Sequence, residues 1–156
     1  MLEIRRAVNE DSNVLLEMLS QIARLHYEGR PDIFKNDSSK YTEDDVKQII
    51  SDNLRPIFVA VELGEVIGYV FCEISENQPH PLMQDFKSLY IDDFFIKEDK
   101  RGNRTGRILF EYIKKYAEEI GCHYIDLNVW EFNKSAIEFY EKCGMTTQRR
   151  HMELKV

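Results

Sequence analysis

The chain has 156 residues, 43% hydrophobic and 31% charged, and its 28 acidic and 21 basic side chains leave a net charge of −7. A chain of this length forms one hydrophobic core, so we expect a single domain over residues 1–156. Its acidic balance argues against nonspecific nucleic-acid binding, which needs a basic surface, and would attract a cationic substrate.

Other features of the sequence indicate where the protein resides and whether it holds a metal. No apolar run approaches the roughly 18 residues that a membrane helix needs, and the N-terminus lacks the apolar stretch of a signal peptide. The three cysteines, Cys72, Cys122 and Cys143, are odd in number and widely spaced, which fits reduced thiols. No cysteine pair or histidine cluster has metal-ligand spacing. We therefore expect a cytoplasmic protein without a metal and without a membrane partner.

The first third of the chain predicts one strand and two helices. Residues 2–8 alternate apolar and polar side chains, as a half-buried strand does. Apolar residues then recur at steps of three and four from Val14 to Leu25, which predicts a helix capped by Asn9 or Asp11 and ended at Gly29. Residues 30–41 are polar and predict a loop. A short helix over residues 42–53 starts with the capping pair Thr42 and Asp45.

The middle of the chain predicts strands. Residues 57–62 and 65–75 are strand-like and only Leu63 and Gly64 separate them, which indicates a tight antiparallel hairpin. A loop over residues 77–81 leads to a third strand over residues 88–98.

The last third predicts two helices and two strands. A basic loop over residues 99–107 precedes a helix, for which we expect an inward face of Ile108, Leu109, Tyr112, Ile113, Tyr116 and Ile120. A strand over residues 123–130, a helix over 133–144 and a strand-like tail over 145–156 complete the chain. The pattern predicts an α/β fold, a mixed sheet with helices on its faces.

The segment from Phe94 to Ile120 carries the strongest chemical signal. Unpaired backbone N–H groups at a helix start favour an anion, because the helix dipole adds to their partial charge. Four cations lie within a few residues of this start, and two glycines would let the backbone approach an anion closely: Lys100, Arg101, Arg104, Arg107, Gly102 and Gly106. The residues alone leave a phosphate site and a solvated basic turn as alternatives.

Two motifs together resemble the GNAT superfamily of acyl-CoA-dependent N-acyltransferases. They are R-G-N-R-T-G-R over residues 101–107 and N-K-S-A-I-E-F-Y-E-K-C-G-M over residues 133–145. In that family the loop reads Q/R-x-x-G-x-G/A and its amides hold the pyrophosphate of CoA. Arg101 and Gly106 match the ends of this pattern, whereas Arg104 replaces its middle glycine. The resemblance implies CoA binding by Arg101, Gly102, Asn103, Arg104, Thr105, Gly106 and Arg107.

Arg104 is the departure from the pattern, and we expect it to keep a negative φ and to align its guanidinium with the phosphates. The resemblance also implies a mostly antiparallel sheet in which residues 92–97 splay away from residues 123–130. The pantetheine arm would then pair with the backbone near Phe94, Phe95 and Ile96 and contact Asn133. Two structural interpretations are compatible with binding of the pantetheine arm: the three side chains pack in the core, and Asn133 caps the last helix.

Tyr140 matches the position where many family members place a tyrosine near the thioester sulfur, as general acid or hydrogen-bond donor. Strand alternation would send Asp92 and Asp93 to opposite faces, so only one can face the acceptor; Asp93 is our candidate base and Asp92 the alternative. Asn128 stands where some relatives carry a glutamate base. Glu28 and His26 border the expected acceptor side, and residues 30–34 are a weaker indication of acceptor recognition.

The resemblance implies an N-acetyltransferase with acetyl-CoA as co-substrate. A primary amine, from a protein N-terminus, a lysine or a small molecule, would attack the thioester directly in a ternary complex. Cys143 adjoins Gly144 at a helix end, and we expect it to be packed rather than to carry an acyl group. The alternative is a non-catalytic acyl-CoA-binding or sensing module, which Arg104 and Asn128 leave open. The strand-like C-terminus favours a homodimer.

Overall fold

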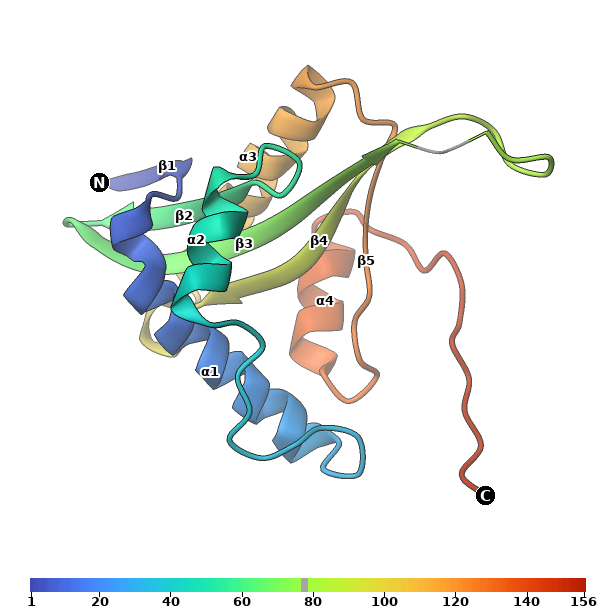
Figure 1. Ribbon diagram of the computed structural model, residues 1–156, viewed down its shortest axis with the longest axis horizontal. Coiled ribbons are helices and arrows are strands. Elements are labelled where there is room, and N and C mark those ends of the chain that lie inside the picture. Colours follow the sequence, from blue (N-terminus) through green and yellow to red (C-terminus); the bar gives the residue numbers. More distant parts are fainter. Residues whose placement is uncertain (77–78) are drawn as a thin grey trace.

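The computed structural model describes residues 1–76 and 79–156, and in this part five strands form one sheet in the order β1-β2-β3-β4-β5 (Figure 1). The strands are β1 Leu2–Arg6, β2 Ile57–Glu62, β3 Glu65–Glu76, β4 Lys87–Ile96 and β5 Tyr124–Leu127. The first four pair antiparallel, and β5 pairs parallel with β4. The predicted α/β fold with a mixed, mostly antiparallel sheet is confirmed.

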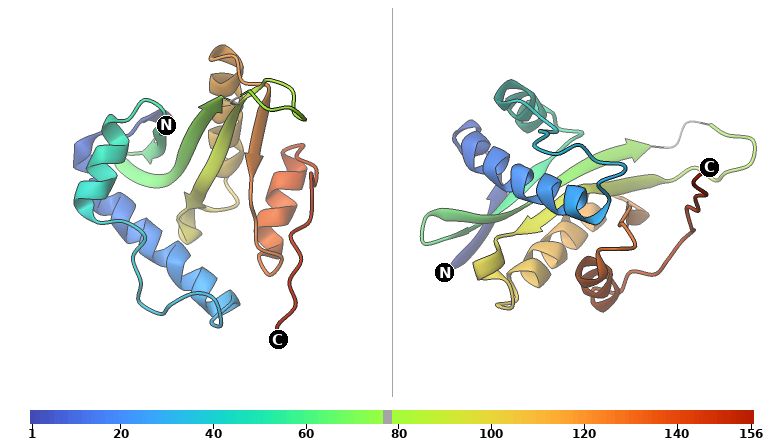
Figure 2. Two further views of the ribbon diagram at one scale, coloured as in Figure 1. Left: turned by 45° about the vertical axis from the view of Figure 1, so that its right-hand side comes forward. Right: turned by 90° about the horizontal axis from the view of Figure 1, so that it is seen from below.

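Helices cover both faces of this sheet (Figure 2). Helices α1 Ser12–Gly29 and α2 Glu43–Ser51 pack on one face, whereas α3 Thr105–Glu119 and α4 Lys134–Lys142 lie on the other. Two short 3-10 turns, η1 Asn9–Asp11 and η2 Glu98–Lys100, precede α1 and α3. Alternation along β3 supplies both cores, since Tyr69 is buried beneath α1 and α2 while Val70 is buried beneath α3.

Local signals in the sequence predicted several boundaries correctly. The Asp45 N–H donates to Thr42 Oγ1 at 3.1 Å and the Thr42 N–H donates to Asp45 Oδ2 at 2.8 Å, so the capping box of α2 is confirmed. The hairpin between β2 and β3 turns at Leu63 and Gly64, whose φ angles of 51° and 77° match a two-residue turn of the type that suits strand twist.

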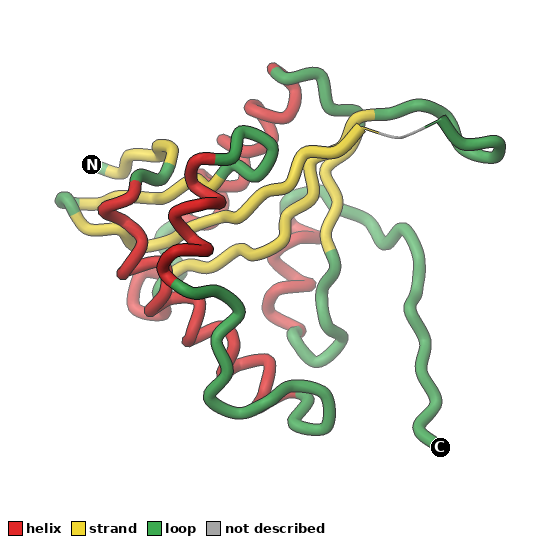
Figure 3. The backbone as a smooth tube through the Cα atoms, in the orientation of Figure 1, coloured by secondary structure: helices red, strands yellow, loops and turns green. Residues whose placement is uncertain are grey.

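Three sequence predictions about elements were wrong. Ile108 and Tyr112 are 45% and 39% exposed, because α3 is rotated so that Leu109, Phe110 and Ile113 face the core. β5 has four residues instead of the eight expected. The tail over residues 146–156 forms no strand and is drawn as loop in Figure 3, since a strand requires a hydrogen-bonded neighbour and this segment has none in the described chain.

The loop predicted over residues 77–81 falls partly outside the described residues, because 77 and 78 are not described; residues 79–86 form neither helix nor strand. No helix in the described ranges combines the length and the apolar character that crossing a membrane requires.

Candidate functional site

Strands β4 and β5 separate halfway along β4. Their pairing runs from Ser88 opposite Tyr124 to Ile91 opposite Leu127, and β4 then continues alone to Ile96 on that side (Figure 3). Within the described residues, no strand lies beside this second half of β4 on the side that faces away from β3. Its outward backbone groups are therefore available to an extended ligand, as in strand addition.

The side chains on this open half of β4 are packed. Phe94 contacts the rings of Phe139 and Tyr140, with centroids 5.4 and 6.2 Å apart. Phe95 is buried beneath α1, and Ile96 is buried beneath α3. Any ligand along this edge therefore meets backbone groups, while the side chains hold the strand in place.

A β-bulge interrupts β4 at the point where β5 leaves it. Asp93 pairs with Phe71 and Ile91 pairs with Cys72, so Asp92 is the extra residue on β4. A bulge breaks the strict alternation of side chains and re-aims those beside it.

Because of this bulge, both carboxylates reach the same side of the sheet. Asp92 Oδ2 accepts hydrogen bonds from Lys40 Nζ at 2.8 Å and from the Tyr41 hydroxyl at 3.3 Å, and Asp93 Oδ1 accepts one from the Tyr69 hydroxyl at 3.3 Å. Tyr41 and Tyr69 both pack in the core beneath α1 and α2. The expectation that Asp92 and Asp93 face opposite sides is wrong.

The environment of Asp93 favours a base that works near neutral pH. Burial raises the pKa of Asp93 to about 6, with the positive charge of Lys40 and the hydrogen bond from Tyr69 opposing the rise. Burial, together with the charge of Asp93, raises the pKa of Tyr69 well above its usual range, so Tyr69 stays protonated and donates. A carboxyl group tuned in this way is ionised at pH 7 and still accepts a proton readily.

Tyr140 lies on α4, on the other side of the opening. Its ring is half-buried against Phe94 and Phe139. Burial, and next the nearby charge of Asp93, raise the pKa of Tyr140 well above its usual range. The hydroxyl therefore remains protonated and able to donate, within electrostatic range of Asp93.

The loop before α3 turns through two left-handed residues. Gly102 has φ 82° and Arg104, the N-cap residue of α3, has φ 64°. The expectation of a negative φ at Arg104 is wrong, because the chain must reverse here to enter the helix. No side chain caps α3 among the described residues, so the first N–H groups of the helix are not satisfied by a cap.

Three of the four cations near this loop have partners within the fold. Lys100 Nζ lies 3.0 Å from Glu62, and Arg101 Nε donates to the carbonyl of Ile96 at 2.9 Å. Arg107 donates to the carbonyl of Lys142 at 2.6 Å. In the described structure the Arg104 side chain forms neither a hydrogen bond nor an ion pair, although its backbone carbonyl accepts from the Ile108 N–H, so its guanidinium is the cation left for a ligand.

Gly106 serves helix packing. A Cβ at this position would lie 3.3 Å from the Phe139 ring, so its missing side chain lets α4 approach α3. Asn103 is exposed, whereas Thr105 is buried at the start of α3. Close approach of a ligand to the loop therefore depends on Gly102 more than on Gly106.

Other predicted residues take structural positions. Asn133 caps α4, since its Oδ1 accepts from the Ala136 N–H at 3.3 Å, which confirms the capping interpretation. Asn128 donates to the Tyr90 hydroxyl at 3.1 Å. Cys143 is half-buried, and burial raises the pKa of its thiol, which does not favour an acyl carrier.

An aromatic cluster joins the end of α1 to the segment that follows β5. His26 stacks on Phe34 with centroids 5.1 Å apart, Phe34 contacts Trp130 at 5.2 Å, and Trp130 stacks on Phe132 at 6.1 Å. Burial and the charge of Lys40 lower the pKa of His26, so it is neutral at pH 7. Glu28, exposed and paired with Arg24, takes no part in this cluster.

Three residues of the site gave no signal in the sequence. Tyr69 reads as an ordinary strand tyrosine, and Lys40 and Tyr41 lie at the end of a polar loop. Only the pairing of β3 with β4 and the docking of that loop bring these side chains to Asp92 and Asp93.

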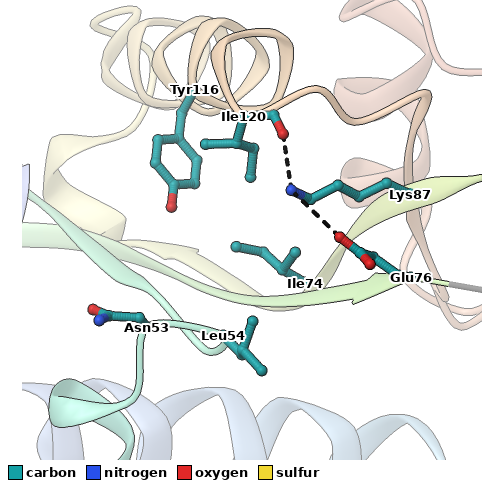
Figure 4. A pocket seen from close by; sticks show the side chains of 7 residues that line it. All are labelled: Asn53, Leu54, Ile74, Glu76, Lys87, Tyr116 and Ile120. Carbon is teal, nitrogen blue, oxygen red and sulfur yellow. Dashed lines mark hydrogen bonds and ion pairs between the residues drawn. The ribbon is translucent and has the colours of Figure 1, made fainter.

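A hollow lies at the opposite end of β4, between α3 and the segment before β2 (Figure 4). Lys87 lines it, but Lys87 Nζ donates to the carbonyl of Ile120 at 2.9 Å and lies 3.9 Å from Glu76. The other lining residues include Leu54, Ile74 and Tyr116. This hollow has no carboxylate pair comparable to Asp92 and Asp93. In the described ranges, no three His, Cys, Asp or Glu side chains are grouped to hold a metal ion.

The model of the acetyltransferase (GNAT) family matches residues 17–145. Among curated proteins, L-ornithine N5-acetyltransferase NATA1 of Arabidopsis thaliana is 30% identical over 95 residues, which are 61% of this chain and 41% of the relative. Thialysine N-epsilon-acetyltransferase of Sus scrofa is 28% identical over 58 residues, or 37% of this chain and 34% of the relative. The matches thus span half or less of these relatives' own length.

Solved structures share the fold of this chain. A point mutant of the BH1408 protein from Bacillus halodurans has a TM-score of 0.95 at 28% identity, with 99% of each chain covered. The aminoglycoside acetyltransferase meta-AAC0020 from an uncultured soil metagenomic sample, in complex with sisomicin, has a TM-score of 0.74 at 15% identity, which shows a shared fold; 99% of this chain and 96% of that chain are covered.

Proposed function

The chain belongs to the GNAT acetyltransferase family, and from this premise we propose that it transfers the acetyl group of acetyl-CoA to a primary amine. The observation that carries the proposal is that Asp93 and Tyr140, one on β4 beyond its pairing with β5 and the other on α4 against Phe94, lie within electrostatic range of each other. One group is a carboxylate with a pKa of about 6 and the other is a hydroxyl that stays protonated. Acyl transfer from a thioester to an ammonium group needs one of each.

The residues on either side of the opening fit acetyl-CoA. The uncapped N–H groups of α3 and the unpaired guanidinium of Arg104 favour the pyrophosphate. We assign pyrophosphate binding to residues 101–107, with Gly102, Asn103 and Thr105 shaping the loop and Arg101, Gly106 and Arg107 holding it against β4 and α4. The backbone of Phe94, Phe95 and Ile96 would pair with the pantetheine arm, and Asn133 would lie beside it.

The chemical steps then follow from the side chains. Asp93 takes a proton from the acceptor ammonium, and the neutral nitrogen attacks the carbonyl carbon of the acetyl group. The C–N bond forms, the C–S bond breaks, and the CoA thiolate leaves; the second proton of the attacking nitrogen passes to that thiolate, so that the products are a neutral amide and free CoA thiol. The Tyr140 hydroxyl donates a hydrogen bond to that thiolate. Because the pKa of Tyr140 is raised, we assign this hydroxyl the stabilisation of the thiolate charge rather than the transfer of its own proton.

The acceptor side suits a cationic primary amine. Asp92 already binds one primary ammonium, that of Lys40, at 2.8 Å, and the net charge of −7 attracts cations. The relatives named above act on ornithine N5 and on thialysine N-epsilon, both side-chain nitrogens. We therefore propose an amine at the end of a flexible chain, carried by a small molecule, a lysine or a protein N-terminus.

The test is release of free CoA thiol from acetyl-CoA across a panel of ornithine, lysine, a polyamine, an aminoglycoside and a peptide with a free N-terminus. We expect at least one amine to accelerate thiol release, and Asp93→Asn to reduce the acceleration by about 10²–10⁴-fold while CoA still raises the melting temperature. CoA binding without acceleration by any amine would favour the non-catalytic acyl-CoA-binding module instead. No stabilisation by CoA at all would overturn the proposal.

A further inference from the structure

One lysine of this chain places its own primary ammonium group beside the proposed base. Lys40 Nζ lies 2.8 Å from Asp92 Oδ2, and Asp92 directly precedes Asp93 in the sequence. The charge of Lys40 is also the largest influence on the pKa of Asp93 after burial, so the two groups are close. Lys40 therefore occupies the place that the proposed function gives to the ammonium group of the acceptor.

Lys40 lies between an exposed loop and an anchored tyrosine. Residues 35–40 are exposed and form neither helix nor strand, and in the described structure no backbone–backbone hydrogen bond involves them. Tyr41 stacks on Phe71 with centroids 6.0 Å apart, and its hydroxyl accepts a hydrogen bond from Arg55 at 3.3 Å. Because a lysine side chain has four rotatable bonds, Lys40 Nζ can move a short distance from Asp92 while Tyr41 keeps the loop at the site.

The groups that face Lys40 hold it as an ammonium ion at neutral pH. Burial lowers the pKa of Lys40, but the hydrogen bond and the charge of Asp92 outweigh burial, so this pKa is raised, with Asp93 adding to the rise. Tyr41, on the same loop, and His26, on α1, also lie within electrostatic range, and both are uncharged at pH 7. Lys40 therefore reacts as a nucleophile only after a base has removed a proton, and Asp93 is a base within its reach.

We propose that Lys40 is a self-modification site, whose side-chain nitrogen accepts the acetyl group of acetyl-CoA bound to the same chain. Asp93 takes one proton from the ammonium group and releases it to solvent, and the neutral nitrogen attacks the acetyl carbonyl carbon. The C–N bond forms, the C–S bond breaks, and a second proton passes from the nitrogen to the CoA thiolate. The products are N-acetyl-lysine and free CoA thiol. This inference rests on the proposed function, since it uses the same base and the same acetyl donor.

Acetylation of Lys40 changes the acceptor site. The acetylated side chain is neutral, so it no longer forms an ion pair with Asp92, which becomes available to the ammonium group of another amine. The acetylated enzyme should therefore have a several-fold lower KM for a cationic amine than the unmodified enzyme, measured by initial rates at a pH well above the pKa of Asp93. An unchanged KM would overturn this consequence.

The direct test uses acetyl-CoA with a deuterated acetyl group, so that acetyl groups added during expression are not counted. The chain is incubated without an added amine, digested, and analysed by mass spectrometry. Lys115 is the internal control for spontaneous acetylation, because its side chain is 77% exposed against 46% for Lys40. We expect Lys40 to be labelled at least about tenfold faster than Lys115, since general-base assistance of about 10²–10⁴-fold is reduced by the scarcity of neutral Lys40.

Asp93→Asn should lower the rate at Lys40 to that at Lys115. Equal labelling of the two lysines in the wild type, or labelling of Lys40 that Asp93→Asn leaves unchanged, would overturn the proposal.

A mixture of two chains tests whether the transfer stays within one chain. Wild type is mixed with a tagged Asp93→Asn chain, which keeps Lys40 but lacks the proposed base, and the two are separated by the tag before digestion. We expect rapid labelling of Lys40 in the wild-type chain alone, with a rate constant that does not change on dilution. Rapid labelling of Lys40 in the tagged chain would contradict transfer within one chain.

The same preparation separates this inference from the proposed function. Acceleration of thiol release by an added amine, with Lys40 labelled no faster than Lys115, would overturn self-acetylation and leave the acetyltransferase function intact. Rapid labelling of Lys40 without acceleration by any amine of the panel would support self-acetylation and show that the panel lacks the acceptor. Absence of both reactions would overturn both proposals.

Discussion

The Tyr69 hydroxyl donates a hydrogen bond to Asp93 Oδ1 across 3.3 Å, because the regular pairing of Tyr69 with Phe95 and of Phe71 with Asp93 places both side chains on one face of the sheet. Tyr69 is completely buried and its ring stacks on Phe95, so the donor is rigidly held. The carboxylate that we propose as the base is therefore oriented by a side chain from the neighbouring strand β3.

The pH dependence of the reaction should report Asp93. Because the pKa of Asp93 is about 6 and only its ionised form accepts a proton, kcat/KM should fall as the pH is lowered through about 6. Asp93→Asn should lower kcat/KM by about 10²–10⁴-fold, the usual contribution of a general base. A steady-state pH profile on the best amine of the panel checks both; a wild-type profile flat from pH 5 to 7 (about one unit either side of this pKa) would contradict the assignment.

A stability measurement will test that Asp93→Asn does not act by unfolding the protein. The pKa of Asp93 is raised from 3.8 to about 6 in the folded state, so its stability contribution is fully present below about 3.8 and is lost as the pH rises through about 6. At pH 7 the ionised carboxylate destabilises the fold, and the neutral amide should raise the melting temperature. This gain should disappear below pH 4, where the wild-type carboxyl is itself protonated.

Tyr69→Phe tests the hydrogen bond that positions Asp93. The substitution keeps the ring that packs against Phe95 and Phe71 and removes only the donor. Since that donor lowers the pKa of Asp93, its loss should move the acidic limb of the kcat/KM profile to higher pH by up to about one unit, as for loss of one hydrogen bond to a charged group. Tyr41→Phe, whose hydroxyl contacts Asp92, is the matched control and should shift the limb less. An unmoved limb in Tyr69→Phe would reduce Tyr69 to a packing residue.

Tyr140→Phe tests the group proposed to face the leaving thiolate. Turnover should fall by roughly 10- to 1,000-fold because one donor to a developing anion is lost. The melting temperature and the affinity for CoA should barely change, since the ring keeps its contacts with Phe94 and Phe139. Stopped-flow thiol release in a single turnover isolates the chemical step. An undiminished single-turnover rate would remove Tyr140 from the reaction.

Arg104 tests the phosphate loop. Its φ of 64° is a strained conformation for arginine, so Arg104→Gly should leave the fold as stable as the wild type or more stable, by up to ~1 kcal/mol. If its free guanidinium meets the pyrophosphate, CoA affinity should nevertheless fall several-fold, and the loss should shrink as salt is added. Arg104→Asn, which tolerates the same φ and also lacks the charge, should behave alike. Equal affinities at low and high salt for all three proteins would exclude Arg104 as a phosphate ligand.

Lys40 tests the acceptor site. Its ammonium occupies Asp92 at 2.8 Å, where a cationic acceptor would have to displace it. Loss of the Lys40 charge also raises the pKa of Asp93, so the comparison is made at a pH well above that pKa. There Lys40→Met should lower KM for cationic amines several-fold with little change in kcat, whereas Lys40→Arg should keep the wild-type KM. A higher KM in Lys40→Met, measured by initial rates at saturating acetyl-CoA, would instead make Lys40 a part of the acceptor site that binds substrate.

Features set by neighbouring residues could be predicted from the sequence. The hairpin at Leu63 and Gly64, the capping of α2 by Thr42 and of α4 by Asn133, and the basic loop before α3 each depend on a few consecutive side chains. The two motifs at residues 101–107 and 133–145 were enough to indicate the family, because the backbone turns and helix starts that they encode are local.

Other features of the site were decided by the tertiary structure alone, because they depend on segments that are distant in the sequence and meet in the fold. Strand pairing between β3 and β4 creates the bulge that brings Asp92 and Asp93 to one face, and loop docking adds Lys40 and Tyr41. The left-handed φ of Arg104 follows from the path between β4 and α3. The tail is the clearest example of what the sequence pattern does not determine. Its alternating residues are typical of a strand, but a strand exists only where another backbone lies within hydrogen-bonding distance. The spacing of side chains along one chain does not specify where that other backbone lies.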